Sequence, residues 1–181
     1  FVDGVRLAVT ATLSSPSFLF RSETQAEPDN PGKVALLDEY ALASRLSYFL
    51  WSSAPDNTLR DLASKKELRK NLRKQVDRML ADEKSDRMVQ NFIGQWLQAR
   101  DLQGLNIDTR RILRERDSRK ANRVFNQGIR RDMKRETEEF FRHILLKNRP
   151  ILELLNGNYS FLNENLAKFY GVSDIRGDEF R

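Results

Sequence analysis

The residue best suited to acid–base or metal chemistry is the single histidine, His143. It follows Glu139 by four positions, a spacing that puts both side chains on one face of a helix. Such a pair can orient an imidazole or contribute to a metal site. A di-iron bundle needs Glu-x-x-His, and Phe140 stands where its glutamate would be, while no spacing suggests further zinc ligands. The pattern therefore indicates a histidine at a helix boundary, where its charge can favour the helix C-terminus.

A non-covalent haem would need axial ligands, and Met79, Met88 and Met133 are the methionines that could accompany His143. All three fall at core-like positions of helical patterns, so packing explains them. The chain has no cysteine, which excludes disulfides, thiolate metal sites and covalent haem attachment through C-x-x-C-H within this segment. We therefore expect no cofactor in this segment.

Carboxylates cluster between residues 132 and 139, where they alternate with lysine and arginine. This alternation is typical of a solvent-facing helix surface with ion pairs. A glycosidase needs two carboxylates across a cleft, which one helix cannot supply. Gly104, Gly128 and Gly157 are isolated, so no phosphate-binding loop is indicated. No serine has a nucleophile-elbow context either, and the sequence identifies no catalytic or metal-binding residue.

An arginine-rich stretch from Asp108 to Arg123 is the best candidate for an interaction site. It holds seven basic residues against three acidic ones, and so carries +4 of the chain's formal charge of +6. Such a stretch can contact phosphate, sulfate or carboxylate groups, or form a solvated connector. No aromatic residue lies between the arginines, which disfavours stacking on single-stranded nucleic acid. The candidate interaction residues are Arg110, Arg111, Arg114, Arg116, Arg119, Lys120 and Arg123.

Helical periodicity runs through most of the chain, and no segment shows the period-two alternation of a strand. Proline and glycine interrupt the periodic segments, most clearly between residues 22 and 37. The predicted N-caps are Asp38, Asp56 or Asn57, Ser85 and Ser160. Propensity and period agree, so we predict an all-α fold, an irregular multi-helix bundle. Apolar residues recur at helical spacing over residues 5–13, 38–50, 59–63, 68–80, 89–97, 124–146 and 162–169.

The chain has 181 residues, which suits one domain or a compact pair. Phe1 in place of Met, and an end within a charged phrase at Arg181, indicate a fragment of a larger multidomain protein. No apolar run approaches the ~20 residues that span a bilayer, so we expect no membrane contact. We predict the end of a preceding helical domain, a linker loop, a main helical domain and the start of a following domain at residues 1–22, 23–37, 38–171 and 172–181.

Three phrases resemble a known family. They are YALASRLSYFLWSSAPD at 40–56, NFIGQWL at 91–97 and YSFLNENLAKFYG at 159–171. In this order they resemble the uncharacterised helical domain of the large secreted cytochrome-like proteins of planctomycetes and related bacteria. The flanking residues are similar to the adjoining domains of those proteins.

The resemblance implies an extracytoplasmic location, periplasmic or secreted. It also implies association with a cytochrome c module elsewhere in the full-length chain, where haem c would serve electron transfer. It implies no catalytic residue, because the family has no established reaction. The arginine content of residues 108–131 departs from the acidic phrases of the family. Three functions stay open: a non-catalytic scaffold or interaction domain, part of an exported enzyme with its active site at an interface to other domains, and a polyanion-binding module.

Within the shared phrases, Arg45 is predicted to pair with a buried carboxylate or with carbonyl groups, since an unpaired buried charge is costly. Trp51 and Trp96 are predicted to be core residues whose indole N–H groups need acceptors. For the arginine-rich stretch we expect docking against neighbouring domains of the same chain or other subunits. Nucleic acid is disfavoured, because no base-reading element accompanies the charge and the resemblance implies a place outside the cytoplasm.

Overall fold

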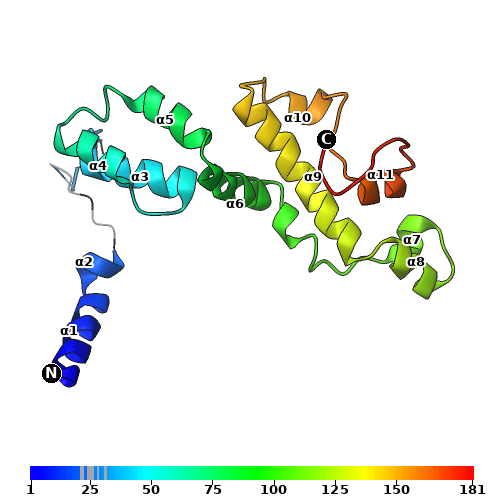
Figure 1. Cartoon of the computed structure of the whole chain (residues 1–181), viewed down its shortest axis with the longest axis horizontal. Coiled ribbons are helices and arrows are strands. Elements are labelled where there is room, and N and C mark those ends of the chain that lie inside the picture. Colours follow the sequence, from blue (N-terminus) through cyan, green and yellow to red (C-terminus); the bar gives the residue numbers. More distant parts are fainter. Residues whose placement is uncertain (21–22, 24–26, 28, 31) are drawn as a thin grey trace. The chain divides into compact units, whose positions relative to one another are not determined.

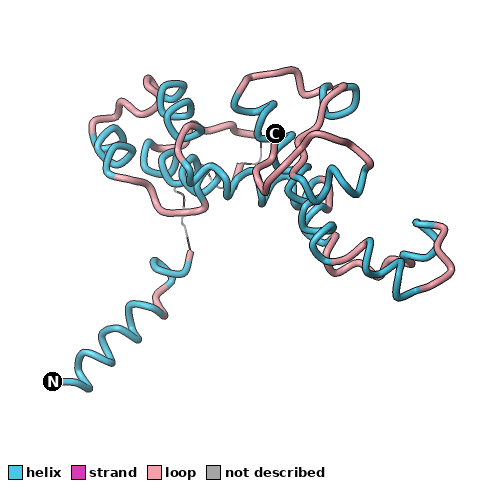
Figure 2. Tube along the Cα trace, turned by 45° about the vertical axis from the view of Figure 1, so that its right-hand side comes forward, coloured by secondary structure: helices cyan, strands magenta, loops and turns pink. Residues whose placement is uncertain are grey.

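A computed structural model describes residues 1–20, 23, 27, 29–30 and 32–181, and it is all-α over this part of the chain (Figures 1 and 2). No strand occurs among these residues, which confirms the predicted all-α, multi-helix fold. Part of the predicted linker lies outside the described residues. The α-helices are α1 Val2–Leu13, α2 Pro16–Leu19, α3 Glu39–Trp51, α4 Asn57–Ser64, α5 Leu72–Leu80, α6 Asp86–Trp96, α7 Thr109–Leu113, α8 Ser118–Val124, α9 Gln127–Leu146, α10 Glu153–Asn156 and α11 Glu164–Tyr170, with 3-10 helices η1 Glu83–Ser85 and η2 Ala99–Asp101.

The helices gather into two compact units. The first holds residues Phe1–Ser47 and Ala54–Leu72, and the second holds Tyr48–Ser53 and Arg73–Arg181. Helix α3 therefore begins in the first unit, and its last residues belong to the second. The basic stretch and the carboxylates of α9 all lie in the second unit.

In the first unit, the sequence predicts the helices better than it predicts which of their residues are buried. Asp38 caps α3 by accepting hydrogen bonds from the backbone N–H groups of the next turn at 2.8 Å. Asp56 caps α4 by accepting from the N–H of Leu59 at 2.9 Å. Leu59 is fully buried, whereas α1 has no buried residue despite its apolar stripe. The stripe predicts the helix, but it does not say what covers it.

The apolar residues at helical spacing in α3 are not all buried. Ala43, Ser47, Leu50 and Trp51 are buried, whereas Phe49 is 60% exposed. The face that packs combines the small residues Ala43 and Ser47 with the large residues Leu50 and Trp51. Arg45, predicted to have a buried partner, is exposed and pairs with the carboxylate of Glu23. The predicted pairing with a carboxylate is right, and the predicted burial is wrong.

Helix α9 is the centre of the second unit, where it packs against α6, α10, α11 and η2 (Figure 1). Its N-terminus is capped by Asn126, whose side chain accepts from the N–H groups of Gly128 and Ile129 at 2.8 and 3.1 Å. A hydrophobic cluster joins its first turns to the end of α8 and to α11. The buried members of this cluster are Phe125, Ile129, Leu162, Leu166 and Ala167.

Neither of the two serines predicted to cap helices in the second unit does so with its side chain, although Ser85 occupies the N-cap position of α6. The hydroxyl of Ser85 donates to the backbone carbonyl of Leu80 at 2.9 Å instead of accepting from α6. Ser160 lies before α11 and donates to Glu136 at 2.5 Å. Asn163 caps α11, since its side chain accepts from the backbone of the first turn. Serine can act as donor or acceptor, and tertiary partners decide between the two.

The two tryptophans differ in burial. Trp51 is 1% exposed, as predicted. Trp96 is 53% exposed, and its neighbours Phe92 and Leu97 are 43% and 44% exposed, so their predicted core positions are wrong. Helix α6 buries Val89 and Ile93 against its neighbours, and its apolar surface extends beyond that face. An exposed aromatic edge therefore remains at the end of α6.

Candidate interaction surface

The basic stretch folds into two short helices, α7 and α8, that pack against each other. We call residues 108–123 the arginine hairpin. Asp108 accepts from the N–H of Arg110 at 3.2 Å at the start of α7. Asp117 accepts from the N–H groups of Arg119 and Lys120 at 2.8 and 3.4 Å at the start of α8. Two of the acidic residues within the stretch therefore serve as helix caps.

The two helices of the hairpin are joined on their inner side. Thr109 is buried, and its hydroxyl donates to the side-chain oxygen of Asn122 at 2.6 Å. Ala121 is fully buried. Next to the hairpin, Arg130 donates to the backbone carbonyl of Leu105 at 2.6 Å, and its guanidinium carbon lies 5.3 Å from the centre of the Phe125 ring. The hairpin packs against the rest of the second unit through Leu113, which contacts the hydrophobic cluster that contains Phe125 and Leu166.

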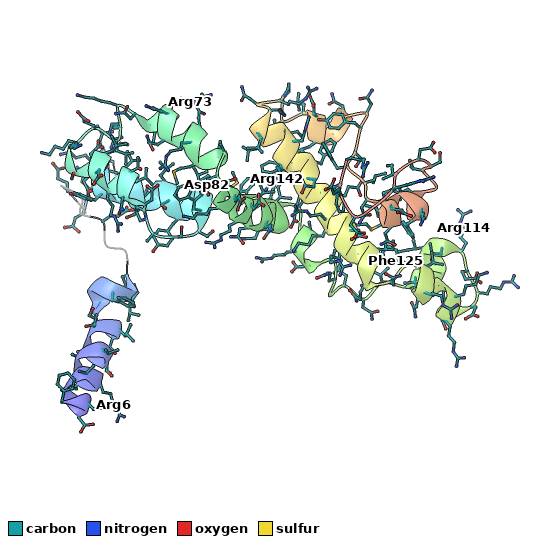
Figure 3. The ribbon with its side chains drawn as sticks, viewed as in Figure 1. Arg6, Arg73, Asp82, Arg114, Phe125 and Arg142 are labelled. Atoms are coloured by element: carbon teal, nitrogen blue, oxygen red, sulfur yellow. The ribbon has the colours of Figure 1, made fainter. Side chains whose placement is uncertain are left out.

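The outer side carries the charge. All seven basic residues of the hairpin are exposed, and side chains in this region extend away from the ribbon (Figure 3). Arg110 pairs with Asp108 at 3.5 Å, and Lys120 pairs with Glu115 at 2.9 Å. Within the described part of the chain, five other cations have no ion pair. These are Arg111, Arg114, Arg116, Arg119 and Arg123.

The Lys120–Glu115 pair fixes the charge at the middle of the hairpin. Its hydrogen bond raises the pKa of Lys120 and lowers the pKa of the Glu115 carboxyl, so both groups are charged at neutral pH. The pair contributes no net charge. The hairpin thus combines an uncompensated group of arginines with an internal carboxylate.

The histidine lies where the sequence places it, in the last turn of α9. Its ring centre is 5.5 Å from that of Tyr159 and 5.2 Å from that of Phe161. Glu139 bonds to Arg135 at 2.6 Å rather than to the imidazole. Among the residues that the structure describes, no group of three or more histidines and carboxylates is arranged to hold a metal ion.

The carboxylates of α9 divide between two faces. Glu138 and Glu139 join an ion-pair network with Lys134, Arg135 and Arg142, as the charge alternation predicts. However, the side chain of Glu138 is only 6% exposed, so it is not on a solvent face. Asp132 is also buried, and accepts from the side-chain amide of Asn165 at 2.6 Å.

Glu136 lies on the other face of α9 and borders a pocket that the sequence analysis did not predict. The pocket has a volume of about 560 Å³ and is lined by the end of α6, the middle of α9 and the α10 segment. Phe140 follows Glu136 by four residues, the spacing of neighbours on one helix face. This spacing is the feature of the sequence that could have indicated the pocket. Only the fold shows which residues lie opposite Glu136 and Phe140 across the pocket.

The sequence profile of the family PSD4, described as protein of unknown function (DUF1592), matches residues 37–172. The chain belongs to the DUF1592 family. The match contains the three shared phrases, the arginine hairpin and the pocket. Comparisons of this DUF1592 chain with curated proteins and with solved structures give no significant match.

The family description assigns no chemistry, so function has to be argued from the surfaces of this DUF1592 domain. In the part of the chain that the structure describes, no helix has both the length and the apolar character needed to cross a bilayer. The two surfaces that stand out are the arginine hairpin and the pocket beside α10.

Proposed function

We propose that this DUF1592 domain is a non-catalytic interaction domain that docks against an acidic surface of another domain or subunit through its arginine hairpin. The observation that carries the proposal is the group of five exposed arginines without an ion pair in the described part of the chain. The Thr109–Asn122 hydrogen bond joins α7 to α8, and Leu113 packs against the hydrophobic cluster, so few side-chain degrees of freedom beyond the arginines themselves are lost on docking.

The mixed charge of the hairpin favours a protein partner over a uniform polyanion. The carboxylates of Asp108, Glu115 and Asp117 lie among the arginines. They would repel a nucleic acid or a sulfated glycan, whereas an acidic protein face can place its own cations opposite them. Guanidinium groups also bind carboxylates through two parallel hydrogen bonds, which adds geometric specificity.

The wider setting of the proposal is an exported, cytochrome c-associated multidomain protein, in which the domain supports electron transfer by holding other domains in place. The support for this part is the resemblance of the three phrases around Trp51, Trp96 and Tyr159. Its test is separate. The full-length protein should carry an export signal and a C-x-x-C-H motif, and should stain for covalent haem. A full-length chain with neither motif would contradict the cytochrome part and leave the docking part unaffected.

The docking test replaces Arg111, Arg114 and Arg119 together with Gln in the full-length protein. Exposed ion pairs contribute about 0.2–1 kcal/mol each, so the variant should dissociate from its partner domain or subunit roughly tenfold more readily at low salt. Wild-type association should weaken as salt rises, because the screening length is ~10 Å at 0.1 M. Calorimetry or analytical ultracentrifugation gives the affinity.

A matched control removes the same charge elsewhere. Lys65, Lys70 and Lys74 are exposed and lie outside the hairpin. Their joint replacement with Gln should leave association unchanged. If the arginine variant assembles normally but loses binding to heparin or DNA, the polyanion function is right and the docking function is wrong.

A further inference from the structure

The pocket beside α10 has the size and walls of a small-molecule site. Its volume of about 560 Å³ falls within the range of ligand pockets. Trp96, Phe140 and Tyr159 give it aromatic walls, and Leu152 and Leu155 give it aliphatic ones. The rings of Phe140 and Tyr159 are stacked, with centres 4.9 Å apart.

Large apolar side chains stay exposed around this pocket. Trp96 is 53% exposed, Leu152 63% and Leu155 88%. Helix α10 has no buried residue, although Ile151 and Leu152 before it and Leu154 and Leu155 within it are apolar. A cluster of exposed apolar residues around a cavity indicates a binding surface rather than an incomplete core.

Among the residues that the structure describes, the charged ones that line the pocket are two carboxylates, Glu136 and Glu153. The charge of Glu153 is balanced by Arg149, whose Nε donates to it at 2.7 Å. That hydrogen bond is the main reason for the lowered pKa of the Glu153 carboxyl. Glu153 also accepts from the hydroxyl of Tyr159 at 2.6 Å.

Glu136 is held differently, because its two hydrogen-bond partners are neutral hydroxyls. Ser160 donates to one oxygen at 2.5 Å, and Tyr170 donates to the other at 2.9 Å. No ion pair of Glu136 is found among the described residues. Its carboxylate is therefore fixed in position with its charge uncompensated, in a chain whose formal net charge is +6.

We propose that the pocket binds a small organic cation with an aromatic or aliphatic body. The cationic group lies against Glu136, and the body lies against Trp96 and Phe140. Ring faces attract cations as well as apolar groups, so the aromatic walls serve both parts of the ligand. A metal ion fits poorly, since hard cations require several oxygen ligands and only one carboxylate is uncompensated here. An anion is disfavoured by both carboxylates.

Gly157 shapes the pocket wall. A Cβ atom at this position would lie 2.9 Å from Cζ of Phe140 and 2.7 Å from the carbonyl oxygen of Glu153. The chain therefore passes Phe140 at a distance that only glycine allows. Gly157→Ala should displace the Phe140 ring and change the shape of the pocket without altering its charge.

The test titrates the whole chain with three probes of similar size, phenethylammonium, phenethyl alcohol and phenylacetate. The readout is the indole N–H signal of each tryptophan in a two-dimensional NMR spectrum, with Trp96→Phe to assign them. Phenethylammonium should shift the Trp96 signal and leave that of buried Trp51 unchanged. It should bind about tenfold more tightly than the alcohol, because only the ammonium group adds the attraction of opposite charges to its hydrogen bond with Glu136. Phenylacetate should bind most weakly.

Charge and shape are separated by variants. Glu136→Gln should reduce the affinity for phenethylammonium to that for the alcohol. Glu139→Gln makes the same change of charge on the ion-pair face of α9 and should have no effect. Gly157→Ala should weaken the binding of all three probes alike.

Three outcomes would overturn the proposal. One is equal binding of the three probes, and another is binding of the cation that Glu136→Gln does not weaken. The third is that none of the three probes shifts the Trp96 signal. If an arginine-containing peptide does shift it, the pocket is a docking site for a protein segment, and the assignment to a small organic cation is wrong.

Discussion

The indole N–H of Trp51 donates a hydrogen bond to the backbone carbonyl of Met79 at 2.9 Å, and both side chains are almost completely buried. The cationic groups of Lys84 and Arg78 lie 4.7 and 5.3 Å from the centre of the Trp51 ring system. The ring thus ties the end of α3 to the end of α5 within the second unit. A residue with this many partners contributes through packing as well as through its hydrogen bond.

Replacing Trp51 with Ala should lower the free energy of unfolding by about 3–5 kcal/mol, as truncation of a buried aromatic residue does. Denaturant unfolding followed by circular dichroism measures the change. Trp96→Ala is the matched variant, since its ring is half exposed. It should cost about 1 kcal/mol or less. Equal losses for the two variants would contradict the difference in burial.

The contrast between the two tryptophans shows which structural features can be predicted from the sequence and which cannot. Period and propensity identify the helices, because both are local properties. They place Trp51 and Trp96 alike, each at the end of an apolar helical phrase. Which of them is buried depends on what faces α3 and α6, and that depends on contacts between segments distant in sequence. The same limit explains why α1 is a helix without a buried residue.

Tyr170 should make stability depend on alkaline pH. Partial burial, reinforced by the hydrogen bond to Glu136, raises the pKa of its phenol above the ordinary value of about 10. The raised pKa belongs to the folded state, so its contribution to stability is complete below about pH 10 and is lost as the pH rises further. The difference in unfolding free energy between wild type and Tyr170→Phe should therefore be constant from pH 7 to 9 and shrink above about pH 10.

The cause of that shift can be tested in the same experiment. Glu136→Gln removes the smaller cause and leaves burial in place. Ultraviolet titration of the phenols should then show Tyr170 ionising at lower pH than in wild type, yet still above its ordinary value. A return to the ordinary value would mean that the carboxylate, and not burial, is the main cause.

Gly157→Ala should destabilise the protein by about 1–3 kcal/mol, the cost of overpacking. The added methyl group would collide with a ring and a backbone carbonyl, and the carbonyl cannot move easily. Gly104→Ala provides the control, because the nearest atom to its Cβ is 3.7 Å away. That substitution should change stability by about 0.5 kcal/mol or less. Thermal unfolding of both variants separates the two cases.

Asn126→Ala should cost about 1 kcal/mol, since it removes the side chain that caps the longest helix. Hydrogen exchange should quicken at the N–H groups of Gly128 and Ile129, and not at the other end of α9. Asn106→Ala, at an exposed position outside any helix, serves as the comparison. Uniform loss of protection along α9 would indicate that the cap stabilises more than the first turn.

The two candidate sites differ in how visible they are in the sequence. The arginine hairpin is a continuous run, so counting charges finds it, and the structure adds only which cations are paired. The pocket is assembled from Trp96, Glu136 and Tyr159, which are separated by tens of residues. None of these types is unusual by itself. Only the packing of α6 and of the α10 segment against α9 brings them together.

The link between α7 and α8 has a consequence for handling the protein. Arg114 adopts a left-handed backbone conformation, with φ of 51°, as the last residue before this short exposed connection. Arg114 and Arg116 are both exposed there, so trypsin has access to two cleavage positions outside regular helix. Limited digestion should cut the chain at this link, giving fragments that end at Arg114 or Arg116. A partner bound to the hairpin would shield both bonds, and the rate of cleavage at this link would then report docking without any label.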